Sequence, residues 1–117
     1  MSYLLLIVEP AGHRDTRPIE AGREAYARML QFTDTLKSRG VLQASHSLTS
    51  DKDAVRVQMR EGETRLVDGP FAEAKEMIGG FFLLDCDTHE EALQIARECP
   101  AVEWGTVEVR QTGPCCD

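Results

Sequence analysis

The 117-residue sequence lacks the features that mark several large classes of protein. Lys and Arg number 13 against 20 Asp and Glu, which gives a formal net charge of -7 at pH 7. Nucleic-acid binding needs clustered basic residues that neutralise phosphates, so we expect no DNA or RNA partner. No apolar run approaches the roughly 20 residues of a membrane-spanning helix, and no basic leader with a small-residue cleavage site is present. These absences predict a cytoplasmic protein with no membrane partner.

Common catalytic motifs are also missing. The sequence contains no phosphate-binding loop, no paired-histidine metal motif, no dinucleotide fingerprint and no Ser, His and Asp in a hydrolase order. We therefore expect no metal and no cofactor. Any catalysis would then depend on acid and base side chains of the chain itself.

The four cysteines do not form a disulfide framework. Cys86 lies in an apolar segment, Cys99 ends a predicted helix, and Cys115 and Cys116 are adjacent near the C-terminus. A reduced protein with two buried thiols explains the first two positions. The adjacent pair could bind a soft metal ion or act in redox chemistry, but no His or second Cys pair lies at ligand spacing.

The hydrophobic pattern predicts a single domain over residues 1–111 and a C-terminal tail over residues 112–117. Apolar residues recur at helical spacing in some segments, and in others they alternate with polar residues or form short continuous runs. The predicted strands are 3–8, 41–48, 54–60, 64–67, 78–85 and 106–110, and the predicted helices are 19–39 and 88–99.

The order of these elements indicates an α+β, ferredoxin-like domain. With the hairpin 54–67 treated as an insertion, the order is strand, helix, strand, strand, helix, strand, which is a split βαβ arrangement with the sheet order 4-1-3-2. Right-handed crossovers place both helices on one face of that sheet. The first helix turns an apolar stripe toward the sheet. The stripe runs from Ala25 to Leu36 and is widened by Tyr26 and Leu30.

Two of the predicted strands are apolar on both faces. Residues 3 to 8 are Tyr-Leu-Leu-Leu-Ile-Val, and residues 81 to 84 are Phe-Phe-Leu-Leu. The two helices cover one face only, so something else must cover the other. A second copy of the chain, packed sheet to sheet, is the simplest cover, and we therefore expect a homodimer.

The most specific motif is the segment 68–82, with the sequence DGPFAEAKEMIGGFF. Its Asp-Gly-Pro-Phe turn, its Ala-Glu-x-Lys-Glu linker and its Gly-Gly-Phe strand entry resemble the DGPF-type branch of the YCII-related (YciI-like) family. The similarity extends from Met1 to about Gln111. It implies a ferredoxin-like domain with an inserted β-hairpin that forms a dimeric α+β barrel. It does not name a substrate.

Asp68 and Lys75 are the first candidates for a site. Asp68 begins the Gly-Pro turn and could simply cap the local backbone. Alternatively, the rigid turn holds this carboxylate at the end of the sheet as a base or as a contact for a ligand. Lys75 lies between two glutamates, where it forms local ion pairs or binds an anionic group. We expect Asp68, Lys75 and the strand of His46 to border one pocket, with Asp68 as its principal polar group.

His46 is the second candidate for proton transfer. It has the same parity as Leu42, Ala44 and Leu48, so it points to a largely apolar face, as a packed histidine would. If that face lined a cavity between sheets, His46 could exchange a proton near neutral pH. The family resemblance adds that a His and Asp pair has been proposed as an active site in the wider YCII-related group, although DGPF-type relatives often look acidic near this position.

Three further residues flank the first loop. His13 and Arg14 precede the first helix, and Glu9 ends the first strand. They are either solvent-exposed residues of a mobile loop or part of a loop that closes over a substrate.

Two functions fit this sequence. One is a cofactor-independent small-molecule enzyme of isomerase or lyase type in a cleft of the dimer, where Asp68 or His46 moves a proton and Lys75 or Arg14 holds an anionic substrate. The alternative is a non-catalytic metabolite-binding or regulatory module, since relatives of this type are often encoded beside extracytoplasmic-function sigma factors. Fold analogy does not separate the two.

Overall fold

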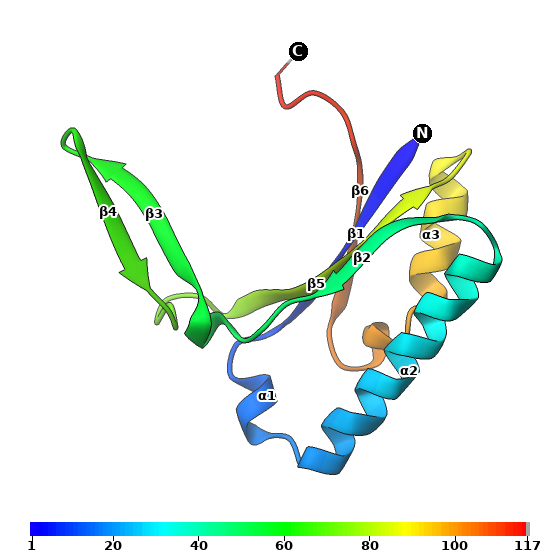
Figure 1. The fold of residues 1–117 in the computed structure, drawn as a ribbon, viewed down its shortest axis with the longest axis horizontal. Coiled ribbons are helices and arrows are strands. Elements are labelled where there is room, and N and C mark those ends of the chain that lie inside the picture. Colours follow the sequence, from blue (N-terminus) through cyan, green and yellow to red (C-terminus); the bar gives the residue numbers. More distant parts are fainter. Residues whose placement is uncertain (117) are drawn as a thin grey trace.

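A computed structural model gives the structure of residues 1–116. The chain forms a four-stranded sheet, a helical layer and a separate two-stranded hairpin (Figure 1). The elements are β1 (Ser2–Pro10), α1 (His13–Thr16), α2 (Ile19–Ser38), β2 (Leu42–Ser47), η1 (Asp51–Asp53), β3 (Val55–Arg60), β4 (Glu63–Asp68), β5 (Glu76–Asp85), α3 (His89–Glu98), η2 (Pro100–Glu103) and β6 (Thr106–Gln111).

The main sheet has the order β2-β5-β1-β6, and all of its strand pairs are antiparallel. This order confirms the ferredoxin-like arrangement that the sequence predicts. Helices α2 and α3 lie on the same side of the sheet (Figure 1). No helix within residues 1–116 is long and apolar enough to cross a membrane.

The ends of α3 and α2 follow from local signals in the sequence. The Thr88 hydroxyl accepts a hydrogen bond from the Glu91 N–H at 3.1 Å, which caps the first turn of α3. The Glu91 carboxylate in turn accepts the Asp87 N–H at 3.1 Å, one residue before the partner of a standard capping box. After α2, Gly40 adopts a φ of 74°, a left-handed conformation that favours glycine at a helix end.

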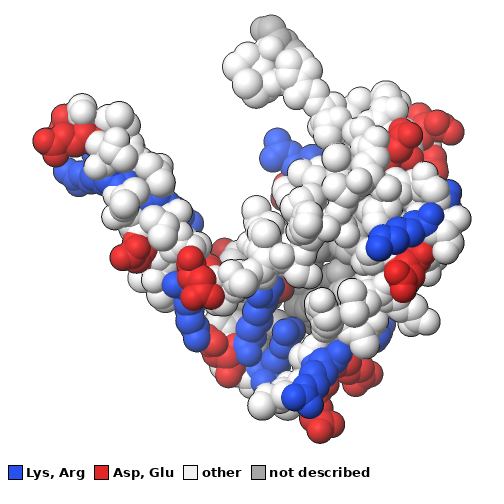
Figure 2. Space-filling view, in the orientation of Figure 1, with Lys and Arg blue, Asp and Glu red and all other residues white. Residues whose placement is uncertain are grey.

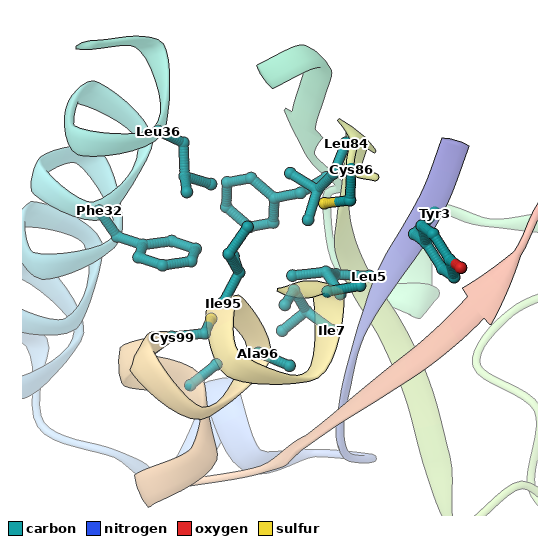
Figure 3. Packing of buried hydrophobic residues seen from close by; sticks show 13 residues of the cluster. Tyr3, Leu5, Ile7, Phe32, Leu36, Leu84, Cys86, Ile95, Ala96 and Cys99 are labelled. Atoms are coloured by element: carbon teal, nitrogen blue, oxygen red, sulfur yellow. The ribbon is translucent and has the colours of Figure 1, made fainter. Parts of the chain in front are cut away.

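The hydrophobic core lies between the helices and one face of the sheet, which we name the helix face (Figure 3). Tyr3, Leu5 and Ile7 of β1 point into the core, and each of these side chains is at most 6% exposed. Burying a side chain of this size stabilises the fold by about 1.5–3 kcal/mol. The core is built from Tyr3, Leu5 and Ile7 of β1, Phe82 and Leu84 of β5, Phe32 and Leu36 of α2, and Ala92, Ile95 and Ala96 of α3.

The other face of the sheet, which we name the open face, has no cover within residues 1–116. It carries the intervening residues of β1 and β5, which are half-buried, together with Ile78, which is 48% exposed. Its apolar members are Leu4, Leu6, Val8, Ile78, Phe81 and Leu83.

A bulge in β2 decides which face His46 occupies. Leu42 pairs with Leu84, but Ala44 pairs with Leu83, so one extra residue separates them. That extra residue reverses the parity of the strand. His46 therefore pairs with Phe81 on the open face, and the two ring centroids are 5.8 Å apart. The expectation that His46 shares a face with Leu42 is wrong for this reason.

Strands β3 and β4 form the predicted hairpin, which we name the arm (residues 55–68). They pair with each other and with no other strand of residues 1–116. The arm projects from the body on the side away from α2 and α3 (Figures 1 and 2). The sheet and the arm thus form the two sides of a wedge.

Candidate functional site

A cavity of about 710 Å³ lies between residues 25–37 of α2 and the helix face. Phe32 and Leu36 of α2 pack in the core, whereas Tyr26 and Leu30, which are 56% and 48% exposed, line this cavity. The apolar stripe of the helix therefore continues past the core and forms one wall of a pocket.

The sequence of β5 explains why the space is empty. On the helix face, Leu84 and Phe82 are followed by Gly80, which lies opposite Ile7 of β1. The glycine has no side chain to fill the gap beneath α2. A Cβ atom at Gly80 would also lie 2.9 Å from the carbonyl oxygen of His46, so the close pairing with β2 leaves no room for a larger residue.

A buried ion pair closes one end of the cavity. Glu9 is 4% exposed and is the one buried charged residue within residues 1–116. Its Oε1 accepts a hydrogen bond from Nε of Arg14 at 2.6 Å. Nη1 of Arg14 donates to the Leu48 carbonyl at 2.7 Å, and Nη2 donates to the Gly79 carbonyl at 3.3 Å. Arg14 therefore ties the α1 turn to β2 and β5 while it orients the Glu9 carboxylate.

Gly79 makes room for this ion pair. The register of β5 against β1 shifts at this point, because Ile7 pairs with Gly80 and Val8 pairs with Ile78. Gly79 is the extra residue, and a Cβ atom there would lie 2.5 Å from Oε2 of Glu9 and 2.7 Å from Nη2 of Arg14. Gly79 thus forms a bulge, and Gly80 permits a close backbone approach.

A second cation and two hydroxyl groups line the same cavity. Arg17 is half-buried, and within residues 1–116 its guanidinium forms no ion pair. Ser45 and Ser47 pair with Phe82 and Gly80 and so share the helix face. The sequence analysis missed Arg17, because its position directly before Pro18 indicates only the start of a helix and not the pocket that the structure forms there.

The structure brings some of the predicted site residues together and separates others. Glu9 and Arg14 line the cavity, and His46 lies at its rim on the edge strand. His13 is half-buried on α1 and does not line it. Asp68 is exposed at the root of the arm, and Lys75 is exposed in the loop that follows. Within one chain, Asp68, Lys75 and His46 therefore do not border one pocket.

The position of the arm explains this separation. Asp68 is the last residue of β4 and pairs with Val55, so it belongs to the hairpin rather than to the main sheet. Lys75 contributes its carbonyl oxygen, which accepts the Ala11 N–H at 2.9 Å, while its side chain stays in solvent. The roles of these two side chains in binding or catalysis stay predictions.

The cysteines divide as the sequence indicates. Cys86 and Cys99 are buried in the core, and burial raises the pKa of the Cys99 thiol to about 11. Cys115 and Cys116 are exposed, and their sulfur atoms are 3.3 Å apart.

The antiparallel sheet, its strand order and its two helices on one face define a ferredoxin-like α+β domain. The chain belongs to the YCII-related family, since the YCII-related domain matches residues 1–114. An uncharacterized protein of Rhizobium meliloti (strain 1021) is 44% identical over 59 residues, which are 49% of this chain and 48% of the relative. The matched part thus spans about half the length of that curated relative.

A solved structure shares the fold over nearly the whole chain. It is 5-chloro-2-hydroxyhydroquinone dehydrochlorinase (TftG) from Burkholderia phenoliruptrix AC1100, in complex with 2,5-dihydroxybenzoquinone. The TM-score is 0.53, and the alignment covers 97% of this chain and 94% of that chain at 15% sequence identity. At this identity the likeness concerns the fold alone.

Proposed function

We propose that the protein is a small-molecule enzyme of isomerase or lyase type that needs no cofactor and binds its substrate in the cavity beneath α2. The observation that carries the proposal is the buried carboxylate of Glu9 at the cavity wall. Burial of a charged group is costly unless it is paired, and Arg14 pairs with one of its oxygens. Within residues 1–116, Oε2 accepts no hydrogen bond. It is also not fully buried, because every fully buried side-chain oxygen or nitrogen of these residues has a hydrogen-bond partner. It is therefore available to a ligand in the cavity.

The remaining groups suit an anionic, planar substrate. Tyr26, Met29 and Leu30 supply an apolar wall, and Arg17 supplies a cation for a carboxylate or phenolate. Glu9 would accept a proton from a carbon or hydroxyl of the substrate and return it at another position, or after a leaving group departs. Such chemistry consumes no oxidant or reductant. In this proposal Glu9 takes the role that the sequence analysis assigned to Asp68 or His46.

The alternative is a non-catalytic metabolite-binding or regulatory module. It is favoured by the hydrogen bonds of Arg14, because all three guanidinium nitrogens donate to Glu9 or to backbone carbonyls of the same chain. In this alternative the ion pair of Glu9 and Arg14 fixes the shape of the pocket and takes no part in proton transfer. Arg17 would then bind the ligand, and no proton would move.

A thermal-shift experiment followed by NMR separates these outcomes. We choose 2,5-dihydroxybenzoquinone, the ligand of the structural neighbour, and benzoate as probes. A ligand at 100 times its Kd stabilises the folded state by about 2.7 kcal/mol. Arg17→Met should abolish the shift, whereas the matched control Arg23→Met, on the exposed surface of α2, should keep it. Absence of any saturable shift with small organic anions would reject the cavity as a binding site.

The NMR spectrum of the ligand then distinguishes enzyme from binder. Turnover that stops in Glu9→Gln, while the thermal shift is retained, supports the enzyme. A ligand that stays chemically unchanged in the parent protein, despite saturable stabilisation, supports the binding module.

We also propose that the working unit is a homodimer in which two open faces pack together. The support is the row of apolar side chains on that face of β1 and β5, which no part of residues 1–116 covers. A stable interface of this kind buries about 1,200–2,000 Å² in total. Sedimentation equilibrium at micromolar concentration should give twice the chain mass of 13.0 kDa, and a mass of one chain would contradict the proposal.

A further inference from the structure

The arm has little contact with the rest of its own chain. Every residue of β4 is exposed, and in β3 only Gln58 is half-buried. The radius of gyration is 16.1 Å, whereas a compact chain of this length has about 13 Å. A two-stranded hairpin is marginally stable by itself in water. The arm therefore needs a surface that its own chain does not provide.

One side of the arm is apolar. Val57 lies directly opposite Leu66, and Val55 and Met59 share their side of the hairpin. These four side chains are between 53% and 69% exposed. Contiguous exposed apolar residues of this kind mark an interaction surface. The opposite side is polar and carries Arg56, Gln58, Arg60, Glu63 and Arg65 together with Val67.

Local contacts close the base of the arm. The Gly69 N–H donates to the Ala54 carbonyl at 2.8 Å, and the Arg56 guanidinium lies 3.6 Å from the centre of the Phe71 ring. A Cβ atom at Gly69 would overlap the carbonyl oxygen of Asp51, so glycine is required for this close approach. These contacts join the base of the arm to the segments that directly precede and follow it.

The arm lies beside the open face. A groove of about 640 Å³ separates them, with Leu6, Val8 and Ile78 from the sheet on one side and Arg56 and Phe71 from the arm root on the other. Each strand of the arm has six residues and so reaches about 20 Å beyond this root. A molecule that packs on the open face therefore lies within reach of the arm (Figure 1).

The open face is suited to a second copy of the same chain. Glu108 and Arg110 of β6 lie on this face, opposite Leu6 and Leu4. In a two-fold dimer each surface meets itself, so an acid and a base on the same face can pair with their counterparts. The apolar side chains of this face are already half-buried, and the two arms add apolar area that the sheets alone lack.

The charge of the arm supports the same partner. It contains Arg56, Arg60 and Arg65 and an equal number of acidic residues, so the whole net charge of -7 belongs to the rest of the chain. Two such bodies repel each other. The neutral arm is the part of the surface that can approach a second copy without net repulsion.

We infer that the arm is a clasp whose apolar side packs against a second copy of this chain, so that two arms hold the dimer together. The inference rests on the proposed homodimer, which a monomeric parent chain would contradict by itself, and adds a role for the arm that the two variants test separately. It does not depend on the proposed catalysis, since the ligand cavity lies on the other face of the sheet. It assigns a role to the inserted hairpin, which neither the core nor the cavity uses.

The test exploits the cross-strand register. The double variant Val57→Glu/Leu66→Lys places opposite charges directly across the hairpin, which retains its pairing but removes its apolar side. The matched control Gln58→Glu/Arg65→Lys places the same pair on the polar side. We expect sedimentation to show at least a 100-fold increase in the dimer Kd for the first variant and less than a 3-fold change for the control.

A second variant guards against a misfolded hairpin. Residues 57–66 are replaced by an Asn-Gly turn that joins Arg56 to Val67, which already lie opposite each other. It should weaken the dimer to the same extent and retain ligand stabilisation in the cavity. A parent dimer that both variants leave intact, or a parent chain that sediments as a monomer, overturns the inference. Loss of ligand binding alone bears on the cavity and not on the arm.

Discussion

On the central strands β1 and β5, the two faces of the main sheet carry similar apolar side chains and have opposite surroundings. On β1, Tyr3, Leu5 and Ile7 are nearly inaccessible, whereas Leu4, Leu6 and Val8 between them are only half-buried. The difference comes from the helices, which cover one face and leave the other open. An apolar strand therefore does not reveal whether a given side chain belongs to the core or to an interface.

The largest expected effect separates these two roles at adjacent positions. Phe82 packs edge-on against Phe32 in the core, with ring centroids 5.3 Å apart, so Phe82→Glu buries an unpaired charge. We expect a loss of about 4 kcal/mol or more, and no folded protein by circular dichroism. Leu83→Glu lies on the open face and should give a folded monomer by sedimentation. Unfolding of both variants to the same degree would contradict the distinction.

The next effect compares a buried ion pair with an exposed one. Arg14→Met leaves Glu9 buried without its partner, which should cost about 3 kcal/mol in urea unfolding. Glu9→Gln in the same chain should recover part of this loss, because the amide carries no charge. Arg39→Met removes the surface pair with Glu98, which has an N···O distance of 2.9 Å, and should cost at most about 1 kcal/mol. Equal costs for the two arginines would show that the Glu9 pair is not effectively buried.

A third comparison concerns buried and exposed thiols. Desolvation raises the pKa of Cys99 from 9.0 to about 11, so the folded state holds this proton more tightly than the unfolded chain. Its contribution is therefore complete below about pH 9 and is lost as the pH rises through about 11, with a size of about 3 kcal/mol. Cys99→Ala should remove this pH dependence. Iodoacetamide should label Cys115 and Cys116 well before either buried thiol in the native protein.

A smaller effect is expected at the arm root. The sequence alone predicted Asp68 as the principal polar group of a pocket, so that Asp68→Asn would weaken ligand binding. With the ligand in the cavity beneath α2, we now expect the thermal shift to match that of the parent, because Asp68 is exposed and does not line this cavity. Weaker binding in Asp68→Asn would instead show that Asp68 belongs to the ligand site, contributed by the second copy of the dimer.

The smallest effect concerns the tail, whose last residue, Asp117, lies outside the described residues. The Thr112 N–H and hydroxyl both donate to the Ser2 carbonyl, at 3.0 and 3.1 Å, and residues 113–116 beyond it are exposed. Removal of residues 113–117 should therefore leave the melting temperature unchanged. A loss of several degrees, or zinc binding that disappears with the tail, would assign the vicinal thiols a role.

The sequence by itself determined the six strands, the two longer helices, their order and the family, but not the short helices α1, η1 and η2. Alternation at Val55, Val57 and Met59 predicted the hairpin, and the two-sided apolar strands predicted the central positions of β1 and β5. These signals are local, because the period of side-chain exposure follows directly from strand and helix geometry.

The tertiary structure decided which of the candidate residues meet. One extra residue in β2 moved His46 to the open face, and the arm carried Asp68 away from the cavity. The ion pair of Glu9 and Arg14 depends on three segments that converge at the Gly79 bulge. Side-chain periods describe one strand at a time, whereas a site depends on register between strands, and a single inserted residue changes that register for every side chain beyond it.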